Sequence, residues 1–220
     1  MQNKQVRQYL EFLQLSGIQD IFVSPQAQQP EPSLDSAAKL QKLAEKYANC
    51  QDCALAAGRD KLVYGEGDPA AKLMIISEGP GQEENISGKP FVGAAGKLLT
   101  KMLAAINLQR SEIYITNVVK CRPPQNRDPQ PEEILACNHI LQEQLEIIQP
   151  RFLLVLGKVA AETLLQKKLS LAAYRKQENY YSGLRTYVTY HPAALLRHAA
   201  WKKPAWIDLQ KLQQDYEKIK

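Results

Sequence analysis

The sequence predicts an α/β fold: a three-layer α/β/α sandwich with a central four-stranded parallel sheet. Two observations carry this prediction. Short, almost wholly apolar segments alternate along the chain with longer segments of helical periodicity, and such strands are typical of parallel sheets covered by helices on both faces. Polar and glycine-rich sequences also follow directly after three of the apolar segments. In open α/β sheets, ligands bind beyond the carboxyl ends of the strands.

The expected elements follow one another in β-α order. Apolar runs predict strands at residues 71–77, 113–119, 152–156 and 185–190. Apolar residues at helical spacing predict helices at residues 36–48, 93–106, 131–148, 157–165 and 204–219. A chain of 220 residues has room for one such domain, which we place at residues 36–220, and an appendage.

The appendage is expected at the N-terminus, over residues 1–35. Val6, Leu10 and Leu13 share one helical face there, which predicts a short amphipathic helix. A stretch rich in proline and glutamine follows at residues 24–33 and is typical of a linker. We therefore expect a helical extension joined by a linker to the α/β domain.

Composition is that of a soluble globular protein, with 45% hydrophobic and 23% charged residues. No apolar run approaches the roughly 18 residues of a membrane span, and the polar first residues lack the apolar stretch of a signal peptide. We therefore expect a cytoplasmic protein without a membrane partner, and we expect a monomer. Lysine and arginine exceed aspartate and glutamate (28 against 23), a balance that permits nucleic-acid binding without proving it.

The chain holds only four cysteines: Cys50 and Cys53 form a C-x2-C pair in a polar segment, and Cys121 and Cys137 stand further apart. Disulfides are rare in the cytoplasm, and a polar C-x2-C is poor core material, so a four-thiolate metal site is favoured over four unrelated thiols. Zinc and a [4Fe–4S] cluster both accept four cysteines. A structural zinc ribbon usually has a second tight pair, so the spacing favours [4Fe–4S], with zinc as the alternative.

Three expected strands end in candidate site residues. The first runs into the Glu-Gly-Pro-Gly sequence at residues 78–81, and the second ends near Asn117, whose amide can read the edge of a base or cap a strand. The fourth runs into residues 189–197 (TYHPAALLR), where His191, leucines and an arginine suit a loop that enters a duplex, although His-Pro is also an ordinary turn. Phe91 is either a stacking platform for a base or an apolar contact with the next helix.

Four motifs resemble those of the family 4 uracil-DNA glycosylases, in that family's order. They are SEGPGQEEN at residues 77–85, GKPFVGAAG at residues 88–96, TNVVKCRPP at residues 116–124 and YHPAALLR at residues 190–197. The cysteine spacing also resembles that family's [4Fe–4S] pattern, and the resemblance extends from about Ala48 to the C-terminus. It implies an enzyme that flips uracil out of single- or double-stranded DNA and hydrolyses its N-glycosidic bond. The abasic site left behind would start base-excision repair.

The resemblance implies roles in base recognition and DNA contact. Phe91 would stack on the flipped uracil, and Asn117 would pair with its O4 and N3–H. Leu195, with Leu196 beside it, would fill the space that the base vacates, while Arg197 would hold the DNA backbone. The four cysteines would hold the cluster.

The resemblance also implies roles in the chemistry. Uracil leaves as an anion with charge on O2, where His191 and the backbone N–H of Gly79 would donate hydrogen bonds, as in an oxyanion hole. Glu78 is the first choice for orienting the attacking water and stabilising the oxocarbenium-like sugar, and Glu84 the second. Glu84 or the Gly81 backbone would exclude the methyl group of thymine.

The sequence departs from its relatives at three positions. Gly79 stands where many other families of the superfamily have a water-activating aspartate, and Ser77 and Asn85 stand where the family's first motif commonly has glycine and aspartate. Two alternatives follow: a non-catalytic DNA-binding or redox-sensing protein on the same scaffold, and a glycosylase for another deaminated base such as hypoxanthine. The loop at residues 122–131 has no histidine, so covalent trapping of DNA is not expected.

Overall fold

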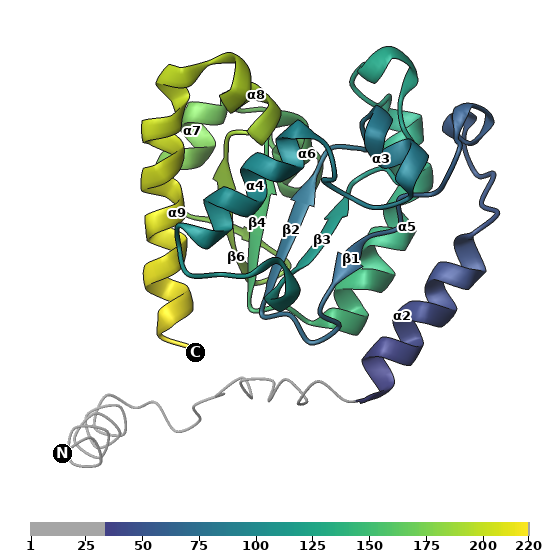
Figure 1. Ribbon diagram of the computed structural model, residues 1–220, viewed down its shortest axis with the longest axis horizontal. Helices are drawn as coiled ribbons and strands as arrows, with labels where there is room; N and C mark the ends of the chain where they lie inside the picture. The colour runs from purple at the N-terminus through teal and green to yellow at the C-terminus, as the bar shows by residue number, and fades with distance from the viewer. Residues whose placement is uncertain (1–33, 220) are drawn as a thin grey trace, which may run out of the picture. The chain divides into compact units, whose positions relative to one another are not determined.

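A six-stranded mixed sheet with the strand order β1-β3-β2-β4-β6-β5 forms the centre of the protein (Figure 1). This computed structural model describes residues 34–219, with side chains from residue 36, and the extension expected at the N-terminus therefore lies outside the described residues. The strands are β1 (Glu66–Gly67), β2 (Leu73–Ser77), β3 (Tyr114–Asn117), β4 (Phe152–Leu156), β5 (Asn179–Tyr181) and β6 (Leu184–Thr189).

The four inner strands, β3, β2, β4 and β6, are parallel, which confirms the predicted central sheet. An antiparallel strand was missed at each edge, because β1 and β5 are too short to produce an apolar run. β5 and β6 form a hairpin whose turn residues, Ser182 and Gly183, both have positive φ (48° and 81°), as a primed two-residue turn requires. Gly67 has φ of +142°, and a Cβ there would lie 2.0 Å from the Ile113 carbonyl oxygen.

Helices cover both faces of the sheet (Figure 1). One face carries α2 (Leu34–Tyr47), α5 (Pro131–Ile148), α6 (Lys158–Leu165) and α7 (Leu171–Lys176). The other carries α4 (Ala94–Ala104), α8 (Pro192–Arg197) and α9 (Lys202–Glu217), and α3 (Gln82–Ser87) follows β2. The longer helices confirm the prediction, whereas the six-residue helices α3, α7 and α8 were missed, because so short a segment gives little periodicity. Short 3-10 turns complete the chain: η1 (Ala54–Gly58), η2 (Arg110–Glu112), η3 (Pro124–Asn126) and η4 (Ala199–Trp201).

The two faces of the sheet are both apolar, which explains the continuous apolar runs in the sequence. Along β2, Met74 and Ile76 point into the core under α2, α5 and α6, while Leu73 and Ile75 point into the core under α4 and α9. All four side chains are 0% exposed. Alternate residues thus serve opposite layers, as strand geometry requires.

The loop before α5 is fixed by polar contacts. α5 begins at a proline and has a capping box formed by Gln130 and Glu133. Arg127 donates to both carboxylate oxygens of Glu133, at 2.8 and 2.6 Å. This bidentate pair holds the loop that runs from the end of β3 to α5, which forms one wall of the pocket described below.

No helix within residues 34–219 is both long enough and apolar enough to cross a membrane.

Candidate active site

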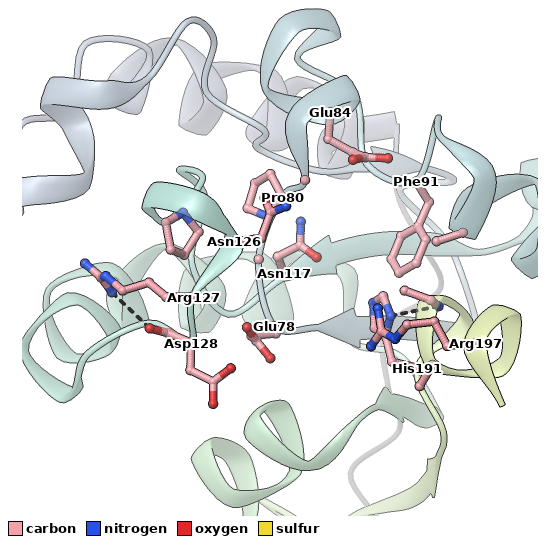
Figure 2. Close-up of a pocket in the computed structure, with 16 residues that line it drawn as sticks. Glu78, Pro80, Glu84, Phe91, Asn117, Asn126, Arg127, Asp128, His191 and Arg197 are labelled. Carbon is pink, nitrogen blue, oxygen red and sulfur yellow. Dashed lines mark hydrogen bonds between the residues drawn. The ribbon is translucent and has the colours of Figure 1, made fainter. Parts of the chain in front are cut away.

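A pocket of about 370 Å³ opens where β2 and β3 end and α8 begins (Figure 2). It lies beyond the carboxyl ends of parallel strands, where the sequence placed its ligand site. The structure brings eight of the predicted site residues together in its lining: Glu78, Gly79, Gly81, Glu84, Phe91, Asn117, His191 and Arg197. Leu195 and Leu196 are not in the lining.

Asn117 is the last residue of β3 and is 2% exposed. Its Oδ1 is buried and has no hydrogen-bond partner anywhere in residues 36–219. A buried polar atom without a partner costs about 1–3 kcal/mol, and a ligand that donates a hydrogen bond would remove that cost. The amide therefore marks a recognition point for a donor group in the pocket.

The backbone at Asn117 is fixed by the buried side chain of Lys120. Lys120 is 0% exposed, and its Nζ donates to the Asn117 carbonyl oxygen at 2.7 Å, to Thr116 Oγ1 at 2.6 Å and to Gln144 Oε1 at 2.7 Å. Burial lowers the pKa of Lys120 to about 7. These contacts fix the strand end that carries the amide. Sequence analysis missed this group, because its members come from β3, the following turn and α5.

Phe91 forms another part of the pocket wall, and its backbone has a strained conformation. Its φ is +52°, in the left-handed region that few residues other than glycine adopt. Arg110 donates to its carbonyl oxygen at 2.9 Å, and Gly96 leaves room for that carbonyl, since a Cβ there would lie 1.8 Å from the oxygen. The Phe91 ring stacks against His191, with centroids 5.5 Å apart and planes at 29°. Phe91 lines the pocket and is 7% exposed. Both interpretations of this residue from the sequence therefore apply: the ring packs beside α4, and it also faces the space for a ligand.

His191 caps α8 and is a neutral hydrogen-bond donor. Its Nδ1 accepts from the backbone N–H of Ala193 at 3.1 Å, which leaves the ring proton on Nε2. Burial, with a smaller contribution from the nearby Arg197, lowers the pKa of His191 to about 4. At neutral pH the imidazole can therefore donate through Nε2 without carrying a charge.

Glu78 and Glu84 both line the pocket but differ in their surroundings. Glu84 Oε1 accepts from the backbone N–H groups of Val92 and Gly93, at 2.9 and 3.0 Å, and so caps α4 and ties it to α3. The Glu78 carboxylate has no hydrogen bond or ion pair within the described part of the chain, whereas the backbone carbonyl of Glu78 accepts from the Val119 N–H at 3.0 Å. Of the two carboxylates, only Glu78 has both oxygens available to a water or a cationic sugar.

Asp128 is a site residue that sequence analysis missed. It lines the pocket, and Figure 2 shows its carboxylate on the same side of the pocket as that of Glu78. Burial raises the pKa of Glu78 to about 7, and the charge of Asp128 adds to that rise. Asp128 lies in an irregular loop before α5, where no strand end or helical spacing marked it.

The departures at Gly79 and Asn85 now have physical reasons. A Cβ at Gly79 would lie 2.9 Å from Val119 Cγ2, so an aspartate there would need Val119 to move. Asn85 is 3% exposed and outside the pocket lining; it donates to Asp60 Oδ2 at 2.5 Å and accepts from the Asp60 N–H at 3.1 Å. Asn85 therefore ties α3 to the loop at Asp60 and does not face the pocket.

The two leucines of α8 lie in different surroundings. Leu195 is 2% exposed and packs in the core between α4 and α9, whereas Leu196 is 51% exposed. Arg197, which follows them, is exposed and lines the rim of the pocket. Of the predicted pair, only Leu196 has its side chain free to enter another molecule.

The four cysteines lie in one apolar cluster between α2, α5 and the sheet. Cys121 and Cys137 are buried, and Cys50 and Cys53 pack against the same core. Burial raises the pKa of Cys137 to about 11, and the neighbouring thiols of Cys121 and Cys53 add to that rise. No three cysteine, histidine or acidic side chains of residues 36–219 are arranged as a metal-binding group.

The surroundings of the cysteines nevertheless suit a thiolate-bound group. Arg59 Nη1 donates to Cys121 Sγ at 3.3 Å and to the Cys50 carbonyl oxygen at 2.8 Å. The backbone N–H of Lys120 donates to Cys137 Sγ at 3.3 Å. Hydrogen bonds to the sulfurs are typical around iron–sulfur clusters, so the donor set fits four-cysteine ligation.

Comparison with known proteins identifies the family to which the chain belongs. The sequence model of the Uracil DNA glycosylase superfamily matches residues 64–210, which include every pocket residue named above. A type-4 uracil-DNA glycosylase of Sulfurisphaera tokodaii is 38% identical over 195 residues, covering 82% of this chain and 83% of that protein. Type-4 uracil-DNA glycosylases of Thermotoga maritima and Archaeoglobus fulgidus are 42% and 37% identical, covering 71% and 79% of this chain and 82% and 91% of those proteins. The chain therefore belongs to the type-4 uracil-DNA glycosylases of this superfamily, which confirms the resemblance seen in its motifs.

Proposed function

We propose that this protein is a uracil-DNA glycosylase that hydrolyses the N-glycosidic bond of an extruded uracil and so starts base-excision repair. The observation that carries the proposal is the unpaired, buried Oδ1 of Asn117, which faces a pocket walled by Phe91 and His191. Family membership supports the same activity. The protein would act as a monomer on DNA, because one chain contains the whole pocket.

Asn117 would select uracil by its polar edge. The buried Oδ1 accepts from uracil N3–H, and Nδ2 donates to O4. Cytosine presents the reverse pattern, an amino donor and a bare ring nitrogen, so both groups would be left unpaired. A polar mismatch of this kind discriminates by about 10⁴–10⁵. Phe91 provides a flat apolar wall for the base, and Glu84 with the Gly81 backbone borders the space where thymine would place its methyl group.

His191 would stabilise the leaving group. As the glycosidic bond breaks, negative charge develops on uracil O2, and the Nε2–H of a neutral imidazole can donate to it. Because the pKa of His191 is lowered to about 4, the ring is neutral at neutral pH. A neutral imidazole is too weak an acid to transfer its Nε2 proton to the uracil anion, so it gives only a hydrogen bond. The backbone N–H of Gly79 would be the second donor. One such donor is worth about 3–4 kcal/mol in the transition state.

Glu78 would act on the sugar side of the bond. In its ionised form it can orient the attacking water and stabilise positive charge on the oxocarbenium-like sugar. With a pKa near 7, Glu78 is about half ionised at neutral pH, so the reaction should speed up as pH rises through that value. Asp128 adds a second negative charge beside it. Glu84 is the weaker candidate, since its carboxylate already caps α4.

DNA would be held by α8. Leu196, which is 51% exposed, would enter the space left by the extruded base, and Arg197 would bind a backbone phosphate. Leu195 would act from within, as the core anchor of that helix. In this proposal only Leu196, and not Leu195, would insert into the DNA.

Cys50, Cys53, Cys121 and Cys137 would hold a [4Fe–4S] cluster, with zinc as the alternative. The cluster would tie the N-terminal part of the domain to the loop after β3, and hydrolysis moves no electrons, so no redox step is needed. Iron and sulfide in equal amounts, with broad visible absorbance in protein purified without air, would support the cluster. A colourless protein that contains zinc would replace it.

The decisive experiment for the activity is a single-turnover assay on oligonucleotides carrying one uracil, one thymine or one hypoxanthine. Strand cleavage by alkali at uracil, and not at thymine, supports the proposal. Faster cleavage at hypoxanthine would make the protein a glycosylase for that base. No cleavage by a protein that still binds the oligonucleotide would favour the DNA-binding alternative.

A further inference from the structure

A column of stacked side chains runs from the protein interior to the surface beside the pocket. Its inner end is the ion pair of Arg175 with Asp208, with N···O distances of 2.6 and 3.1 Å. The Arg175 guanidinium lies over the Tyr190 ring at 4.6 Å, and Tyr190 stacks on Trp201 with centroids 5.0 Å apart and planes at 22°. His198 lies against Trp201, with centroids 4.2 Å apart. Each member is held by the next, down to an ion pair whose aspartate is 4% exposed.

The outer end of this column is exposed next to the helix that would enter DNA. Trp201 is 37% exposed, although a tryptophan ring carries a large apolar surface. It ends η4, the short turn that follows α8 after one intervening residue, His198. Nearer the interior, Tyr190 directly precedes the pocket residue His191 in the chain. In Figure 1, α8 lies at the end of the sheet toward which the parallel strands point. The column therefore lies beside α8, and two of its members, Tyr190 and His198, are next in the chain to the pocket residues His191 and Arg197.

Exposed cationic side chains lie close to Trp201 along the chain. Arg197, Lys202 and Lys203 are exposed, and none of them has an ion-pair partner within residues 36–219. An exposed aromatic ring among cations is the arrangement with which proteins bind single strands of nucleic acid, by stacking and by phosphate contacts. Charge complementarity thus points to DNA as the partner of this surface.

We propose that Trp201 and His198 form a ledge for the nucleotides that flank the extruded uracil on one side, with Arg197, Lys202 and Lys203 against their phosphates. The proposal rests on the proposed function, because the ledge continues the DNA path outward from the pocket. Trp206 provides a contrast: it lies further along α9, is 39% exposed and has no ring partner among the described residues.

Fluorescence can test the ledge without catalysis. The chain contains two tryptophans, so Trp206→Phe leaves Trp201 as the only tryptophan and Trp201→Phe leaves Trp206, and excitation at the red edge of the absorption band excludes the tyrosines. On titration with a single strand that contains no uracil, Trp201 emission should change while Trp206 emission stays constant. Unchanged Trp201 emission, or an equal change at both positions, would overturn the proposal. Because the strand contains no uracil, this result is independent of whether the protein excises uracil.

Kinetics provide the second test. Trp201→Ala should raise KM about tenfold on a long single strand with a central uracil, the effect expected for one lost stacking contact, with kcat little changed. Trp201→Tyr should restore KM. Two further substrates carry the uracil at the 5′ end or at the 3′ end of the strand. Because the ledge lies on one side of the pocket, Trp201→Ala should raise KM on only one of these two substrates. An equal rise in KM on the substrates with a central, a 5′-terminal and a 3′-terminal uracil would indicate a purely structural role for Trp201 and contradict the ledge. No excision by the unsubstituted protein would instead defeat the proposed function.

Discussion

Two groups of polar side chains lie near the same end of the sheet, and they differ in how they are paired. Around Asp208, both carboxylate oxygens accept hydrogen bonds, from Arg175 and from Thr189 Oγ1 at 2.7 Å. In the pocket, Asn117 Oδ1 is unpaired, and the Glu78 carboxylate has no partner among the described residues. Buried polar groups that are satisfied within the fold maintain structure, whereas an unsatisfied group in the lining of a pocket can be satisfied by a ligand. Substitutions in the first group should therefore lower stability, whereas substitutions in the second group should lower activity without lowering stability.

The largest effect is expected at Asn117. Asn117→Ala should lower kcat/KM for uracil by about 10³-fold or more, because the base would lose its polar reading while the wall of Phe91 remains. The stability of the fold should not fall, since the removed Oδ1 has no partner in the described structure and its unpaired burial costs the fold about 1–3 kcal/mol. Single-turnover rates and denaturant unfolding of the same preparation measure both. Unchanged uracil cleavage would contradict the reading role.

Substitution of Asp208 should have an effect of comparable size, but on the free energy of unfolding and not on catalysis. Asp208→Ala leaves Arg175, whose side chain is 13% exposed, without its counter-ion. Removing one partner of a buried pair typically costs about 3–5 kcal/mol, and the partial exposure of Arg175 places the loss at the lower end of that range. The midpoint of denaturant unfolding should therefore fall sharply. Asp215→Ala, which removes a carboxylate at the surface end of α9, serves as the control with a smaller loss. Equal losses in the two variants would show that the buried network is not the stabilising one.

His191→Ala should reduce the rate of cleavage by about 10²–10³-fold, the usual effect of removing one donor to a developing anion. DNA affinity should change far less, because the imidazole acts on the transition state. Single-turnover rates and fluorescence anisotropy of labelled DNA separate the two quantities. A loss of affinity as large as the loss of rate would argue against transition-state stabilisation.

The smallest effect is a shift in pH dependence. Cleavage should rise with pH as Glu78 ionises, because its pKa is raised to about 7. Asp128→Asn removes a neighbouring negative charge and should lower the pKa of Glu78, moving the rise in rate to lower pH. Glu217→Gln, at the far end of α9, should leave the profile in place. A profile that does not move with Asp128→Asn would exclude coupling between the two carboxylates.

Sequence and structure agree where local pattern decides the outcome. The four inner strands and the long helices follow from apolar periodicity, and the strand-end motifs led to the pocket residues. The groups that were missed depend on contacts between distant segments: Lys120 meets Gln144 of α5, and Arg110 holds the Phe91 loop. Asp128 reaches the pocket from an irregular loop. No periodicity or spacing in the sequence encodes such meetings.

The contrast between the two pocket carboxylates tests the account most directly. Glu78→Gln and Glu84→Gln should be compared in rate and in unfolding free energy at pH 8. Above pH 7 Glu78 is ionised in both the folded and unfolded states, and the fold then bears the cost of its burial, since its folded pKa lies above 4.5. Glu78→Gln should therefore lose most activity and gain about 1–2 kcal/mol of stability, after allowance for solvent screening. Glu84→Gln should lose about 0.5–1 kcal/mol of stability as its helix cap weakens. Loss of stability in Glu78→Gln, or full activity in it, would contradict the account.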